Sequence, residues 1–189
     1  MAGEERVGAR AHGDGRQRDT PGFVKAAAAL AAGAAVRRLW RGRHLFPLEG
    51  RTVMVTGGAR GLGLLLAREF GRFGATVAIC SRTPSELENA ARDLRGRGIR
   101  THAAPCDVTD REQVRRFVDD LVRATGRLDV LVNNAGVIAM APFAHTTPAD
   151  FERSLATHFW GPLHAILAAR PYLRRARGRI LNKIGRAHV

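Results

Sequence analysis

The stretch that decides the fold is "RTVMVTGGARGLGLLLAREFGRFG", residues 51–74. Its first six residues, 51–56, are mostly apolar and β-branched, which predicts a short buried strand. Residues 61–74 have a helical apolar face and end on a glycine, which predicts a helix. The glycines between the strand and the helix have the spacing G-x-x-x-G-x-G. A glycine-rich turn from a strand into a helix is the context in which such glycines bind phosphate.

Glycines in this turn let the backbone bend tightly and let a pyrophosphate approach without meeting a Cβ atom. The N-terminus of the following helix offers free N–H groups and the positive end of a dipole. We therefore expect a dinucleotide phosphate site formed by Thr56, Gly57, Arg60, Gly61, Leu62 and Gly63.

Strands and helices alternate along the rest of the chain. Further strands are expected at 75–80, 99–106, 128–136 and 178–182, the last of them buried, and further helices at 83–98, 109–126 and 147–176. We expect Pro162 and Pro171 to kink or break the last helix. The strands are apolar on both faces, as in a parallel sheet covered by helices on both sides. The predicted fold class is α/β, an incomplete Rossmann-like doubly wound parallel sheet of about five strands with a helical N-terminal extension.

Several motifs in order resemble the short-chain dehydrogenase/reductase family. The glycine spacing after the first strand is similar to that family's spacing and differs from the G-x-G-x-x-G of other Rossmann enzymes. "CDVTD" (106–110) resembles its acidic turn, and "NNAG" (133–136) resembles the segment after its fourth strand. "GRILN" (178–182) resembles its fifth strand, so the resemblance covers about residues 48–182.

The resemblance implies an oxidoreductase that transfers a hydride between a nicotinamide cofactor and a carbonyl or secondary alcohol. It implies that Asp107 hydrogen-bonds the adenine and that Val108 lines the adenine pocket. It also implies that the segment of Asn134, Ala135 and Gly136 flanks the nicotinamide ribose. A non-catalytic dinucleotide-binding or regulatory protein is the alternative. Such a protein would have kept the fold and lost the active site.

The end of the second strand indicates the cofactor. It reads "ICSRT" (79–83) and contains no Asp or Glu, whereas dinucleotide folds that prefer NAD place an acid there for the ribose 2′-OH. Ser81 and Arg82 stand at this place, and Arg82 would pair with a 2′-phosphate. Arg60 in the glycine loop could reach the same phosphate. We therefore favour NADP(H) over NAD(H).

The catalytic residues that the resemblance implies are missing. The family uses a Tyr for proton transfer, a Lys four residues later to lower its pKa, and a Ser after the fifth strand to orient the substrate oxygen. No Ser follows Asn182, and the only tyrosine, Tyr172, precedes the fifth strand. The position of the family's relay Asn holds His158, which could carry protons or could be a packed helix residue. We therefore assign no catalytic residue and expect no turnover from residues 1–189.

The last seven residues, "KIGRAHV" (183–189), are what a common sequencing-library adapter encodes in this frame. Lys183 is one of two lysines, while 29 of the 31 basic residues are arginine. We interpret 183–189 as a non-native tail read through into adapter, after a natural sequence that runs to about Asn182. The chain would then be the N-terminal fragment of a longer reductase, with an unpaired sheet edge that favours aggregation.

Three further segments are expected along the chain. Residues 1–22 form a disordered polar tail, 23–46 an Ala/Arg-rich helical extension, and 47–182 the partial dinucleotide-binding domain. The apolar run 26–36 is too short to span a bilayer, which needs about 20 residues. The extension could lie on a membrane surface, or it could pack on its own domain or on a partner subunit.

Composition bounds the remaining alternatives. The net charge of +14 would suit an anionic partner, but the arginines are spread along the chain, which argues against nucleic acid. The two cysteines, Cys80 and Cys106, form neither a disulfide framework nor a metal motif. His145 and His164 show no ligand spacing, so no metal is expected. We expect a cytoplasmic protein, peripheral at a membrane at most, that acts on a small carbonyl or alcohol and could form a homo-oligomer.

Overall fold

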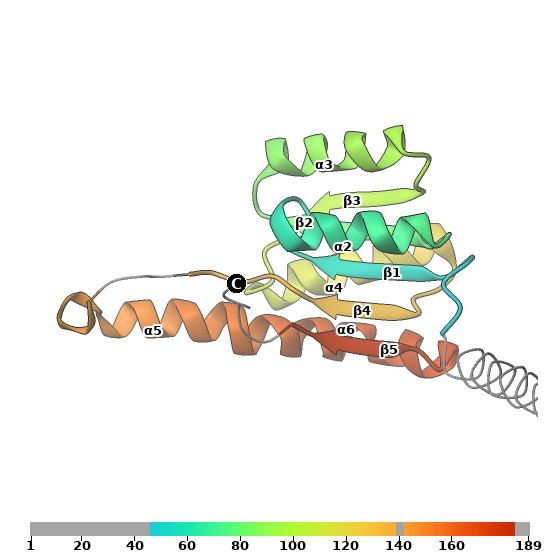
Figure 1. Ribbon diagram of the computed structural model, residues 1–189. Coiled ribbons are helices and arrows are strands. Elements are labelled where there is room, and N and C mark those ends of the chain that lie inside the picture. Colours follow the sequence, from blue (N-terminus) through green and yellow to red (C-terminus); the bar gives the residue numbers. More distant parts are fainter. Residues whose placement is uncertain (1–45, 139–141, 184–189) are drawn as a thin grey trace, which may run out of the picture. The chain divides into compact units, whose positions relative to one another are not determined.

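Five parallel strands form one sheet in the order β3-β2-β1-β4-β5 (Figure 1). The computed structural model describes residues 46–138 and 142–183. The strands are β1 (Thr52–Thr56), β2 (Thr76–Ser81), β3 (Thr101–Pro105), β4 (Val130–Asn133) and β5 (Arg179–Asn182). Because β1 pairs with both β2 and β4, the strand order reverses direction at β1.

Helices cover both faces of the sheet. The helices that cover it are α2 (Gly61–Arg72), α3 (Pro84–Gly96), α4 (Arg111–Thr125) and α6 (Gly161–Ala176), and α5 (Pro148–Leu155) precedes α6 along the chain. A short 3₁₀-helix, η1 (Phe143–His145), precedes α5, and a π-helix, η2 (Ala156–Trp160), joins α5 to α6. Helices α2 and α3 lie on one face of the sheet, and α4 and α6 on the other (Figure 1). The predicted doubly wound α/β sheet is confirmed.

The core lies between the sheet and these helices. On the α4 and α6 face, Met54 of β1 and Leu131 of β4 are fully buried against Phe117 of α4 and Ala165 of α6. On the other face, Val53, Val55, Val77, Ile79 and Leu94 are also fully buried. The three central strands, β2, β1 and β4, are therefore buried on both faces, as in a parallel sheet that helices cover on both sides.

Both ends of α4 are set by residues that commonly begin and end helices. Asp110 caps its N-terminus and accepts hydrogen bonds from the N–H groups of Glu112 and Gln113, at 2.9 and 3.0 Å. Gly126 ends the helix in the left-handed conformation, with a φ of 74°. This is the usual chemistry of a capped helix that stops at a glycine, and it lies within the helix expected at 109–126.

Two expectations for the C-terminal part are corrected. Pro171 lies inside α6 without ending it, while Pro162 stands in the first turn of α6, directly after the π-helix η2. The expectation that β5 is a buried strand is wrong, because all four of its residues are exposed. β5 is the edge of the described sheet, so Ile180 and Leu181 remain 43% and 45% exposed.

A buried carboxylate fastens the amino ends of β1 and β4. Asp129 is fully buried and accepts from Arg51 at 2.8 Å, from Arg127 at 2.7 Å and from the N–H of Thr52 at 2.9 Å. Burial alone would raise the pKa of Asp129. The hydrogen bonds from Arg127, Thr52 and Arg51 outweigh burial, so the pKa of this carboxyl lies below its ordinary value.

Several sequence predictions lie outside the described residues. These are the polar tail 1–22, the extension 23–46 apart from Phe46, and the tail 183–189 apart from Lys183. The N–H of Lys183 donates to the oxygen of Asn133 at 2.9 Å and so extends the pairing of β5 with β4. Among the helices of residues 46–138 and 142–183, none is long and apolar enough to cross a membrane.

Candidate functional site

The carboxyl ends of the strands bring most of the predicted site residues to one edge of the sheet. The glycine loop follows β1, Ser81 ends β2 and Arg82 follows it, Asp107 lies after β3, and Asn134 follows β4. These ends meet where the strand order reverses, at the left-hand end of the sheet in Figure 1. Open α/β sheets bind their ligands in the crevice at such a point.

Two glycines of the loop have a structural requirement. Gly61 opens α2 with a φ of +53°, and a Cβ atom there would meet nothing within 4 Å. The backbone beside the helix N-terminus therefore faces open space. At Gly63 the opposite holds, because a Cβ atom would collide with the oxygen of Gly57 and would lie 2.6 Å from Nδ2 of Asn134. The first glycine leaves room for a ligand, and the second lets the loop pack closely.

Asn134 joins the loop after β4 to the glycine loop. Its Nδ2 donates to the oxygens of Thr56 and Gly57, at 3.0 and 3.3 Å. The buried hydroxyl of Thr56 accepts from the N–H groups of Asn134 and Ala135, at 3.0 and 3.1 Å. Two loops that are 78 residues apart in sequence are thus held as one unit, from which Gly136 continues into solvent.

Two arginines near this edge of the sheet form ion pairs that are long and exposed to solvent. Nε of Arg60 is 3.6 Å from Glu86, and a terminal nitrogen of Arg82 is 4.0 Å from Asp107. The Arg60 and Arg82 side chains are 81% and 60% exposed. Exposed pairs of this length contribute little to stability, so both guanidinium groups are available to an incoming anion. Sequence reasoning missed Glu86 as the partner of Arg60.

The turn after β3 is ordered by its own hydrogen bonds. Oδ1 of Asp107 accepts from both the N–H and the hydroxyl of Thr109, each at 2.9 Å. The N–H of Asp107 donates to the side chain of Gln113 at 3.0 Å. Val108 is buried, and a Cβ atom on Gly161 of α6 would lie 2.9 Å from its side chain. The turn is therefore fixed to α4 and packed against α6.

His158 lies in the π-helix η2 and contacts the loop after β4. Its Nε2 lies 2.9 Å from the oxygen of Val137 and 3.4 Å from the nitrogen of the same residue. A Cβ atom on Gly136 would come within 2.9 Å of the imidazole. π-helical turns inside α-helices often occur at functional sites. His158 is thus placed beside the predicted nicotinamide segment, and the sequence pattern did not reveal Val137 as its partner.

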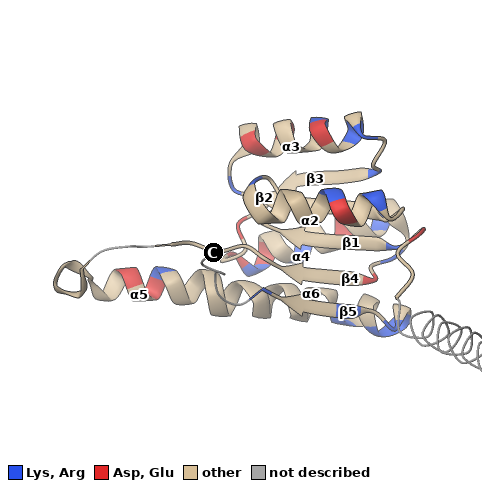
Figure 2. Cartoon of the chain, in the orientation of Figure 1, with Lys and Arg blue, Asp and Glu red and all other residues tan. Residues whose placement is uncertain are grey.

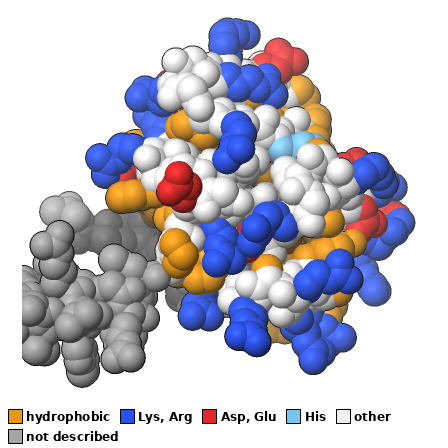
Figure 3. Space-filling model, turned by 90° about the vertical axis from the view of Figure 1, so that its right-hand side faces the viewer, with side chains coloured by type: hydrophobic (Ala, Val, Ile, Leu, Met, Phe, Trp, Pro, Cys, Tyr) orange, Lys and Arg blue, Asp and Glu red, His pale blue; other side chains and the backbone are white. Residues whose placement is uncertain are grey.

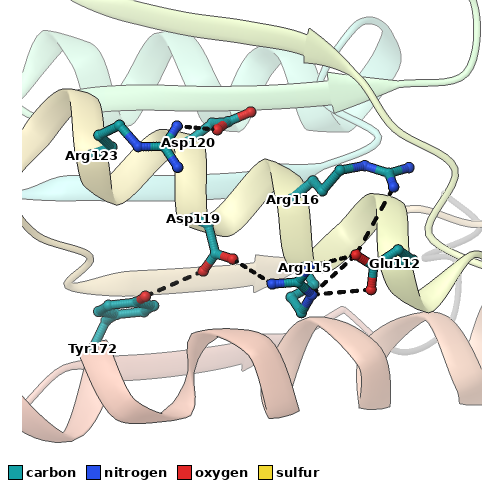
Figure 4. A network of polar contacts seen from close by, with 7 residues as sticks. All are labelled: Glu112, Arg115, Arg116, Asp119, Asp120, Arg123 and Tyr172. Atoms are coloured by element: carbon teal, nitrogen blue, oxygen red, sulfur yellow. Dashed lines mark hydrogen bonds and ion pairs between the residues drawn. The ribbon is translucent and has the colours of Figure 1, made fainter.

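The only tyrosine lies elsewhere. The hydroxyl of Tyr172 donates to Asp119 at 3.2 Å, which joins α6 to α4 (Figure 4). Asp119 also accepts from Arg115 at 3.0 Å, within a ladder of ion pairs along α4. Tyr172 is therefore part of a contact between α6 and α4, and that it is not the family's proton donor stays a prediction.

The two cysteines are free and buried at the ends of β2 and β3. The hydrogen bond with Cys106, followed by burial, raises the pKa of the Cys80 thiol well above its ordinary value. Within the described part of the chain, no group of three or more His, Cys, Asp or Glu residues is arranged to hold a metal ion.

A parallel sheet with a glycine-rich turn after its first strand, and with further polar turns at the same edge, defines the class of dinucleotide-binding α/β proteins. The short chain dehydrogenase family model matches residues 51–185, and the chain belongs to this family.

Named proteins of this family are similar to the chain over much of its length. The 11-beta-hydroxysteroid dehydrogenase 1A of Arabidopsis thaliana is 38% identical over 141 residues, which cover 71% of this chain and 39% of that protein. A metagenomic short-chain oxidoreductase solved in complex with NADP has a TM-score of 0.67 and 31% identity, over 76% of this chain and 67% of that one.

A blue fluorescent protein from a metagenomic library, solved with NADPH, has a TM-score of 0.66 and 34% identity. That match covers 72% of this chain and 56% of the other. The chain thus spans 39% to 54% of the length of the curated relatives that it matches.

Proposed function

We propose that this chain is the cofactor-binding part of an NADP(H)-dependent oxidoreductase that acts on a carbonyl or secondary alcohol. The observation that carries the proposal is the placement of Arg60 and Arg82. Both are exposed near the carboxyl end of β2, where no acid occupies the NAD-selecting position. A 2′-phosphate would replace two weak ion pairs with charge-assisted hydrogen bonds.

The geometry of the glycine loop supports a dinucleotide. The open space beside Gly61 suits the approach of a pyrophosphate to the first N–H groups of α2. Asn134 and Thr56 hold the loop after β4 against the glycine loop, so Ala135 and Gly136 would meet the nicotinamide ribose without rearrangement. Ser81, Asp107 and Val108 would surround the adenosine half.

The chemistry that this cofactor supplies when bound is the donation or acceptance of a hydride. The residues of this chain would bind and orient the cofactor. His158 would act as a positioning residue that holds Val137 and the segment before it. We expect no residue of this chain to act as the family's Tyr, because its only tyrosine, Tyr172, lies in α6 before β5 and donates to Asp119. We therefore expect cofactor binding without steady turnover, and the carbonyl or alcohol chemistry would need the longer parent.

Calorimetric titration of the purified 189-residue chain with NADP⁺ and NAD⁺ tests the proposal. We expect NADP⁺ to bind at least about 10-fold more tightly, since a charge-assisted hydrogen bond contributes about 1.5–3 kcal/mol. Arg82→Ala should lower the affinity for NADP⁺ by about 10-fold or more and leave the affinity for NAD⁺ unchanged. Arg111→Ala, at the start of α4, is the control with the same loss of charge.

Equal affinities for the two dinucleotides, or the absence of binding by a folded chain, would overturn the proposal. Steady oxidation of NADPH by this chain with a carbonyl substrate would show that the catalytic part of the proposal is wrong. Tight binding of NADP⁺ by the complete natural protein, with no turnover on any carbonyl, would instead favour a non-catalytic dinucleotide-binding or regulatory protein.

A further inference from the structure

A groove of about 690 Å³ lies between α3 and β3, apart from the glycine loop. Its apolar lining comes from Leu87 and Ala91 of α3 and from Ala103 and Pro105 of β3. Its charged lining is Glu88, Arg92 and Arg95. The volume falls in the range of roughly 300–1,000 Å³ that is typical of ligand sites. The proposed function does not use this groove.

The floor of the groove is the free edge of the sheet. Among the described strands, β3 pairs only with β2. The oxygen of Arg100 accepts from Val77, and the N–H of Cys106 donates to Ser81, so even-numbered residues of this segment direct their backbone groups toward β2. In a parallel ladder alternate residues point to opposite sides. The N–H and C=O of Ala103 therefore point away from β2, out of the free edge of the sheet.

The side chains of β3 also alternate, between the two faces of the sheet. His102 faces α4, where its ring meets Phe117 edge-to-face, whereas Ala103 and Pro105 line the groove on the α3 side. β3 carries no charged residue, whereas α3 beside it carries both signs (Figure 2). An extended segment laid along β3 would thus meet open backbone groups, an apolar wall and the charged side chains of α3.

The charges of α3 indicate what such a segment contains. Arg92 bonds only the amide oxygen of Asn89, at 3.3 Å, and Arg95 takes part in none of the ion pairs of the described residues. The two arginines are three positions apart, so both lie on one side of α3 about one turn apart. Alternate side chains of a strand lie about 6.6 Å apart on one face. Acidic residues at alternate positions of a strand could therefore reach both guanidinium groups.

We propose that this groove binds an extended acidic peptide segment of a partner protein, added to the sheet as a strand beside β3. Addition to a free sheet edge supplies main-chain hydrogen bonds, and the arginines supply the preference for acid. A second copy of this chain is a poorer occupant, because edge-to-edge pairing would bring the same arginines together. Figure 3 shows the side of the molecule at the amino ends of the strands, and the basic side chains on that side are scattered and form no continuous stripe of the kind that nucleic acid needs.

Fluorescence anisotropy with a labelled Val-Glu-Val-Glu-Val peptide and the full chain tests the proposal. We expect saturable binding that the double variant Arg92→Glu/Arg95→Glu weakens by at least about 10-fold, the effect of losing about 1.4 kcal/mol. The same variant should bind the Val-Lys-Val-Lys-Val peptide, which the natural chain should not. Arg174→Glu/Arg175→Glu, in the last turn of α6, is the control with an equal change of charge.

Two N-methylated peptides separate strand addition from simple charge attraction. N-methyl groups on both Glu residues block one edge of the peptide, and N-methyl groups on the alternate Val residues block the other edge. We expect one of these peptides to lose binding and the other to keep it. Equal binding of both, loss of both, or binding that ignores Arg92 and Arg95 would overturn the proposal. Equally tight binding of a single-stranded oligonucleotide at the same site would also overturn it.

Discussion

Nε2 of His158 lies 2.9 Å from the backbone oxygen of Val137, which joins the π-helical turn of η2 to the loop after β4. That loop is also held from its other end, where Asn134 and Ala135 donate to the hydroxyl of Thr56. The predicted nicotinamide segment is therefore fixed on two sides. His158, which we predict to stand at the position of the family's relay Asn, thus contacts the backbone of the predicted site.

Replacing His158 tests whether this bond orders the loop. His158→Ala removes a hydrogen bond that contributes about 0.5–1.5 kcal/mol, so we expect the amides of Asn134 and Ala135 to exchange about 2- to 12-fold faster. Hydrogen exchange followed by mass spectrometry measures this. His158→Asn keeps a polar group and should restore part of the protection. His145→Ala, in η1, is the control, and unchanged exchange in His158→Ala would show that the bond does not order the loop.

Glu86 gives an opposite test of the phosphate site. Because Glu86 competes for Arg60, the change Glu86→Gln should raise the affinity for NADP⁺ by up to about 5-fold, the value of one exposed ion pair. The affinity for NAD⁺ should stay the same. Parallel titrations of the two dinucleotides measure the ratio, with Glu88→Gln on the same helix as control. A fall in NADP⁺ affinity on removal of this acid would mean that Arg60 does not reach the 2′-phosphate.

The sheet and most helix ends could be predicted because they depend on local patterns. Apolar strands, the cap at Asp110 and the stop at Gly126 are all written in neighbouring residues. The continuity of α6 through Pro171 and the exposure of β5 could not be predicted in this way. Whether a strand such as β5 is buried depends on whether another strand pairs with its outer edge, and the order of all the strands in the sheet decides this.

The candidate site also has a part that local sequence motifs predict and a part that only the tertiary fold forms. The glycine loop and "NNAG" were visible because their residue types and spacing are fixed by backbone geometry. The pairs Arg60–Glu86 and His158–Val137 were not, because each joins segments that only the tertiary fold brings together. The groove beside β3 has no motif at all, since it is formed by a sheet edge and the helix beside it.

The buried carboxylate of Asp129 should control stability in acid. Its pKa lies below the ordinary value, so its contribution is complete above about pH 3.9 and is lost as the pH falls through the lowered pKa. Asp129→Asn should lower the free energy of unfolding at neutral pH by about 1–3 kcal/mol, because Arg51 and Arg127 lose their partner. Urea unfolding from neutral to acid pH measures both effects. Asp120→Asn, at an exposed ion pair of α4, should change little, and an equal loss in the two variants would contradict the assignment.

His102 should make the fold weaken at mildly acid pH. Its Nε2 is buried without a hydrogen-bond partner among the described residues, and its ring lies edge-to-face against Phe117 at 5.5 Å. Burial lowers the pKa of His102 from 6.5, so the folded state favours the neutral ring. The unfolded chain then binds more protons than the folded chain below about pH 6.5, and stability falls as the pH drops from there through the lowered pKa. In His102→Gln, which cannot titrate, the urea midpoint should change less between about pH 7.5 and about pH 5 than it does in the natural chain. His145→Gln serves as the control because it removes a histidine in η1 instead, and an equal flattening in both variants would assign the pH dependence to histidines in general rather than to His102.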